Sequence, residues 1–140
     1  MTLDNYLQEA GALATLSGVL AGFAFSAVVQ FLATERRGKL HTALIVVFSV
    51  STLMFLFSLI TFIMGFATAA ELNDIPPSNL DWVGIYSFLV LIGAIYLFFA
   101  GIGMAGWMRS KAAGIATTVF SLITMCLTAW VIFSTIAVFM

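Results

Sequence analysis

Four long stretches of this chain contain no Asp, Glu, Lys, Arg or His. They cover residues 10–34, 42–70, 82–108 and 112–140. Each is longer than the roughly 18–20 residues that a helix needs to cross about 30 Å of hydrocarbon. Only 8% of the residues are charged, against about a quarter in soluble domains, so the chain could not cover itself with polar surface. We therefore predict membrane spans near residues 11–33, 41–70, 82–107 and 112–138.

The length and uniform hydrophobicity of these segments predict helices. Backbone groups in lipid are satisfied only within helices or closed β-barrels. Barrel strands would appear as segments of about ten residues that alternate apolar and polar side chains, whereas these segments are far longer and apolar on every face. The predicted fold class is all-α, an integral membrane protein with one four-helix transmembrane domain over residues 1–140.

The basic residues predict how the chain sits in the membrane. All of them lie in the loops 34–41 and 108–112, namely Arg36, Arg37, Lys39, Arg109 and Lys111. These two loops must lie on the same side, and an excess of Lys and Arg marks the cytoplasmic side. The N-terminal stretch and residues 71–81 carry acidic but no basic side chains. We expect both loops in the cytoplasm and both termini outside, in a plasma or inner membrane.

The first span carries a stripe of small and polar residues. It comprises Gly11, Thr15, Gly18, Gly22, Ser26 and Gln30. Their three- and four-residue spacing places them on one narrow face of a helix. Small residues at this spacing let helices approach closely, so one interpretation is helix packing. The other is that several copies of this span surround a narrow water-accessible path, with Gln30 amides replacing part of an ion's hydration shell.

Glycines also gather at the end of the third span, in the segment GIGMAGW. Their small size predicts tight packing against the first or second span, and a flexible helix end is the alternative. The residues that we assign to helix packing in the whole chain are Gly11, Gly18, Gly101, Gly103 and Gly106.

Several function classes are not expected from this composition. No charged side chain lies within the predicted spans, although proton-coupled transporters usually need one. The only histidine is His41 and the only cysteine is Cys126, so neither a metal-dependent nor a nucleophilic active site can be assembled within one chain. We expect no enzymatic activity, no metal and no cofactor. A net charge of −1 leaves no basic face for nucleic acid.

The segment LAGFAFSAVVQ, residues 20–30, resembles the pore-helix motif of the Orai calcium-channel family. That motif reads Leu-Ser-Gly-Phe-Ala, followed by an apolar run and a Glu. The residues that match in place are Leu20, Gly22, Phe23, Ala24, Ala27 and Val29. The resemblance implies a ring-shaped homo-oligomer, a hexamer in that family, whose first helix lines a central pore. Carried over by position, the pore-lining residues would be Thr15, Val19, Gly22, Phe23, Ser26 and Gln30.

The chain departs from the family pattern in three respects. Gln30 stands where the family has the Glu of its selectivity filter, which removes the negative ring that concentrates Ca²⁺. Thr15 stands at the basic position near the inner end of the family's pore. The family keeps both termini in the cytoplasm, whereas the basic loops here place them outside.

The stripe and the resemblance together lead to a functional expectation. We expect a homo-oligomeric membrane channel for ions, with the first helix at the axis and the lipid bilayer and further copies of the chain as partners. A non-conducting structural or interaction protein is one alternative, because the stripe would also suit packing against a partner. A small dimeric uniporter or exporter is the other.

The predicted orientation is tested by cysteine labelling. Cysteines introduced at Ser78 and at the C-terminus should react with a membrane-impermeant reagent applied from outside, because both would lie beyond the outer interface. A cysteine at Gly38 should be protected. Labelling of Gly38 with protection of Ser78 would reverse the orientation.

Overall fold

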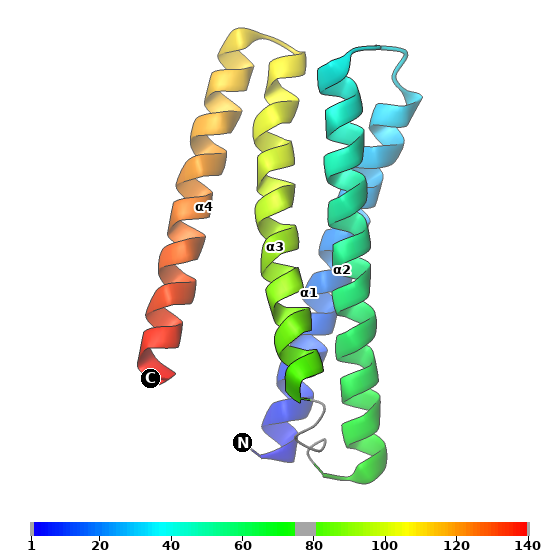
Figure 1. The fold of residues 1–140 in the computed structure, drawn as a ribbon, viewed down its shortest axis with the longest axis vertical. Coiled ribbons are helices and arrows are strands. Elements are labelled where there is room, and N and C mark those ends of the chain that lie inside the picture. The colour runs from blue at the N-terminus through cyan, green and yellow to red at the C-terminus, as the bar shows by residue number, and fades with distance from the viewer. Residues whose placement is uncertain (1, 75–80, 140) are drawn as a thin grey trace.

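The computed structural model describes residues 2–74 and 81–139, and almost all of them are helical. The elements are α1 (Leu3–Ala33), α2 (Lys39–Leu72), α3 (Asp81–Ala105), the short 3₁₀ turn η2 (Gly106–Met108) and α4 (Lys111–Phe139) (Figure 1). Each of the four α-helices is long and apolar enough to cross a membrane. The chain is therefore an all-α protein with the architecture of a multi-pass integral membrane protein. Ser78 lies outside the described residues.

The helices extend beyond the predicted spans, most clearly at the start of α1. This helix begins at Leu3 rather than near residue 11, because the Thr2 hydroxyl accepts a hydrogen bond from the backbone N–H of Asn5 at 3.3 Å. Asp4 in the first turn adds a negative charge where the helix dipole favours one. At its C-terminal end, α2 stops at Asn73, whose left-handed backbone conformation (φ 53°) commonly terminates helices.

The four helices form an open row rather than a closed bundle. Each helix packs on its neighbours in sequence, and α4 packs chiefly on α3 and η2. Figure 1 shows α4 standing at one edge of the array, while α1 lies behind α2. The row therefore has two outer helices, α1 and α4, whose far faces contact no other part of the described chain extensively.

Small side chains hold α1 against α2. The buried residues of α1 recur every three or four positions and are Ala10, Ala14, Ser17, Ala21, Ala24 and Val28. The Ser17 hydroxyl is satisfied by its own helix, donating to the Leu13 carbonyl at 2.8 Å. Small residues at this spacing bring two helix backbones close enough for extensive van der Waals contact.

Phe48 of α2 links the first three helices. Its ring stacks on Phe31 of α1 with 5.8 Å between centroids and meets Phe98 of α3 edge-on at 5.6 Å. Gly101 of α3 leaves the space that this ring fills, because a Cβ there would lie 2.8 Å from the Phe48 Cζ atom. The aromatic contacts therefore depend on the absence of a side chain at residue 101.

A buried pair of serines joins α2 to α3 further along. The Ser58 hydroxyl donates to the Ser87 carbonyl at 3.1 Å, and the Ser87 hydroxyl donates to the Ser58 carbonyl at 3.5 Å. Both side chains are fully buried. Interhelical hydrogen bonds of this kind stabilise membrane helices by about 0.6 kcal/mol each on average.

Hydroxyl groups of α4 bind backbone carbonyls of α3. Thr117 and Thr118 both donate to the Gly103 carbonyl, at 3.0 and 3.2 Å, and Ser121 donates to the Phe99 carbonyl at 2.6 Å. In the opposite direction, the Tyr96 hydroxyl of α3 donates to the Met125 carbonyl at 3.2 Å. The α3–α4 interface is thus a ladder of polar contacts, although both helices are apolar overall.

The two basic loops lie at the same end of the molecule, as expected from the alternation of spans. Figure 1 shows both connections together at one end, with the two termini at the other. The Arg36 guanidinium in the first loop donates to the Met108 carbonyl at the end of η2, at 2.6 Å. A cation at the C-terminal end of a helical segment also satisfies the helix dipole.

The contact between Phe48 and Gly101 predicts a local stability effect. Gly101→Leu should destabilise the fold by about 1–3 kcal/mol, because the added side chain overlaps the Phe48 ring. Unfolding in mixed micelles by titration with a denaturing detergent measures this change. Gly84→Leu on the same helix is the matched control, since a Cβ there meets nothing within 4 Å. Equal effects of the two substitutions would contradict this account of the core.

Candidate functional site

The residues predicted to line a pore lie together on one exposed face of α1. Thr15, Val19, Gly22, Phe23, Ser26 and Gln30 are all exposed. The residues of α1 that pack on α2 have the same spacing but lie about half a turn away around the helix axis. The predicted face therefore points away from α2 and stays uncovered in the single chain, with even Phe23 62% exposed.

The glycines of the stripe do not share one environment. A Cβ at Gly18 would lie 3.7 Å from Leu59, and one at Gly11 would lie 4.0 Å from Phe66, so these two residues border the α1–α2 interface. A Cβ at Gly22 would meet nothing within 4 Å. Alanines, rather than this stripe, form the centre of the contact with α2.

The polar side chains of this face differ in how they are satisfied. The Thr15 hydroxyl donates to the Gly11 carbonyl of its own helix at 2.9 Å. Ser26 and Gln30 make no side-chain hydrogen bond to any residue that the structure describes. Gln30 lies in the last turn of α1, at the same end of the molecule as the basic loops. The face thus offers an unpartnered hydroxyl and an unpartnered amide toward one end of the helix.

The glycines at the end of the third span face two different helices. We predicted that they pack against the first or second span, and Gly101 lies against Phe48 of α2. Gly103 lies instead against Ser121 of α4, and Gly106 against Thr117. Sequence reasoning missed this α4 surface because its hydroxyl groups also fit bonding within their own helix. The four-residue spacing of Thr117 and Ser121 was the available signal.

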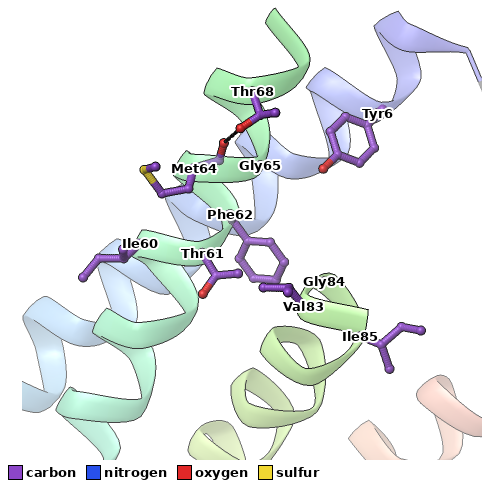
Figure 2. Close-up of a pocket in the computed structure, with 10 residues that line it drawn as sticks. All are labelled: Tyr6, Ile60, Thr61, Phe62, Met64, Gly65, Thr68, Val83, Gly84 and Ile85. Atoms are coloured by element: carbon purple, nitrogen blue, oxygen red, sulfur yellow. Dashed lines mark hydrogen bonds between the residues drawn. The ribbon is translucent and has the colours of Figure 1, made fainter. Parts of the chain in front are cut away.

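A groove of about 740 Å³ lies at the opposite end of the helices from Gln30, between Tyr6 of α1, α2 and the start of α3. Figure 2 shows the ring of Phe62 between α2 and the residues Val83 and Gly84 of α3. Its hydroxyls from α2 are occupied, since Thr61 donates to the Phe57 carbonyl and Thr68 to the Met64 carbonyl. This groove is a mostly apolar surface of α2 and the start of α3, and it does not include the exposed face of α1.

No group of three or more metal-binding side chains occurs within residues 2–74 and 81–139. Cys126 is exposed on α4. His41 lies in the first turn of α2, with its ring edge-on to Phe31 at 6.0 Å. Comparisons with protein-family models, with curated proteins and with solved structures found no match. The geometry of the exposed face of α1 is therefore the sole ground for choosing it as the candidate site.

Proposed function

We propose that this protein is a homo-oligomeric membrane channel for ions in which α1 lines the pore. The observation that supports this function is the uncovered face of α1, which combines Gly22 with the unpartnered side chains of Ser26 and Gln30. Polar side chains that face lipid make no favourable interaction with it, whereas the same side chains around a shared axis would contact water and ions. The face also lies opposite the helix that anchors α1 to its own chain.

The open row of helices supports a ring with α1 inside and α4 outside. A single row encloses no path, so a pore requires several copies of the chain. The outward side chains of α4 are bulky and apolar, among them Ile115, Phe120, Leu127 and Phe133. Such a surface suits lipid, whereas the small and polar face of α1 suits an axis where several helices meet. The two edges of the row thus favour opposite positions in a ring.

Two apolar residues on the same face bear on gating. Val19 and Phe23 are 52% and 62% exposed and lie between the polar groups of the face. In a ring of α1 helices they would form an apolar constriction, which stops ion flow by excluding water. Gly22 beside them would leave room for the Phe23 ring to move.

The same two residues favour a second candidate function. A face that mixes large apolar and small residues also suits packing against the helix of a partner, as in small-xxx-small interfaces. In that case the protein would be a non-conducting structural or interaction protein.

The channel proposal predicts assembly of several copies. Mass measurement of the protein in nanodiscs or native detergent should give an oligomer of defined size, because only a ring of α1 helices encloses a path. Ser26→Leu should lower conductance without dissociating the oligomer, since the larger side chain fills the path. A protein that is monomeric across membrane mimetics would exclude the channel.

Selectivity provides a second test of the proposed pore. Gln30→Glu would place several carboxylates around the axis, so cation permeability and block by divalent cations should both rise in planar bilayers. We expect the reversal potential in a salt gradient to shift towards that of the cation.

The matched control for this experiment is the pair Ile115→Gln and Ile115→Glu. Ile115 is 57% exposed and lies four residues from the start of α4, as Gln30 lies three residues from the end of α1. This pair makes the same change of charge on the outer helix, and selectivity should not respond to it. An oligomer that conducts identically with Gln and Glu at residue 30 would remove this residue from the pore.

A further inference from the structure

All the basic side chains of the chain come together at one end of the helix row. The loop after α1 contributes Arg36, Arg37 and Lys39, and the loop before α4 contributes Arg109 and Lys111. The hydrogen bond from Arg36 to the Met108 carbonyl joins the two loops directly. Glu35 is the one acidic residue in these loops. The result is a compact cationic surface, which the net charge of −1 for the whole chain did not predict.

Two arginines form a small recess within this surface. Arg36, Met108 and Arg109 line a hollow of about 300 Å³. Arg36 uses Nη1 for the Met108 carbonyl, which leaves most of the five N–H donors of its guanidinium available. The Arg109 side chain makes no hydrogen bond or ion pair with any described residue. A planar guanidinium with free donors suits the paired oxygens of a phosphate group.

The start of α2 adds to the positive potential at this end. Its N-cap residue, Gly38, provides no side-chain hydrogen bond to the first turn. The first N–H groups of a helix without such a cap remain available to an anion, and the helix dipole favours negative charge there. By contrast, α4 is capped by Ser110, whose hydroxyl accepts from the Ala113 N–H at 3.1 Å.

We propose that this end of the protein binds the phosphate group of an anionic phospholipid, with Arg36 and Arg109 as the specific contacts. The recess lies at the ends of membrane-spanning helices, where lipid headgroups are the most abundant anions. Trp107 is next to it and 46% exposed, and such tryptophans are enriched at the headgroup level. Clusters of four to eight basic residues beside membrane helices attract anionic lipids. This proposal does not depend on channel activity.

Native mass spectrometry in detergent tests the site with phosphatidylglycerol and phosphatidylcholine as probes. The unmodified protein should retain phosphatidylglycerol preferentially. Arg109→Gln should weaken this binding about fivefold, as expected for one basic residue at a membrane surface. Arg37→Gln is the matched control, because it removes the same charge from a residue that does not line the recess. It should weaken binding clearly less.

Three results would overturn the proposal. Equal binding of the two lipids would show that the negative charge is not recognised. Equal weakening by Arg37→Gln and Arg109→Gln would show diffuse attraction without a site. Displacement of the lipid by inorganic phosphate at constant ionic strength would show a site for a soluble anion.

Arg36→Lys keeps the charge but loses the planar fork, so weakened binding with unchanged thermal stability would support the direct contact.

Discussion

Lipid offers no hydrophobic gain when two apolar helices meet, so this chain must hold its helices together in other ways. It uses three. Small residues such as Ala21 and Ala24 bring α1 close to α2, and Gly101 makes room for Phe48 between α2 and α3. Hydroxyl groups that donate to carbonyls of the neighbouring helix join α3 to α4, as Ser121 does to Phe99. The architecture follows from where these contacts occur, because an apolar side chain without a close-packed partner gains as much from lipid as from a neighbouring helix.

This distribution of contacts explains why the fold is a row and why its two edges differ. On α1 the alanines face α2, and the small and polar residues on the other side, such as Gly22 and Ser26, remain uncovered. On α4 the hydroxyls of Thr117 and Ser121 face α3, and bulky apolar side chains such as Phe120 are uncovered. One edge thus suits other copies of the chain and the other suits lipid. The proposed ring would serve both edges at once.

The four long helices were predictable because a charge-free run of this length in a membrane can satisfy its backbone groups only as a helix or in a closed β-barrel. Hydropathy marks where a helix enters lipid rather than where it begins, so the predicted span near residues 11–33 does not specify the start of α1 at Leu3. The stripe of α1 was recognised, but both a stripe of alanines and a stripe of glycines have helical spacing, and only the structure shows that Ala14 rather than Gly22 faces α2. The contact of Gly106 with Thr117 depends on the pairing of α3 with α4, which the hydropathy of one helix does not specify.

The position of Gln30 predicts the sign of the electrostatic potential at one mouth of the proposed pore. Gln30 lies in the last turn of α1, and Arg36 and Arg37 follow within the next seven residues. In a ring, each copy would bring the loop after α1 to the mouth beside this amide, and Glu35 would offset only part of the charge of that loop. The potential there would be positive and would be concentrated by the low-dielectric surroundings. The Gln30 amide is consistent with this positive potential. A carboxylate at the same position would attract cations, whereas the neutral amide does not. A channel built in this way would admit anions more readily than cations at that mouth.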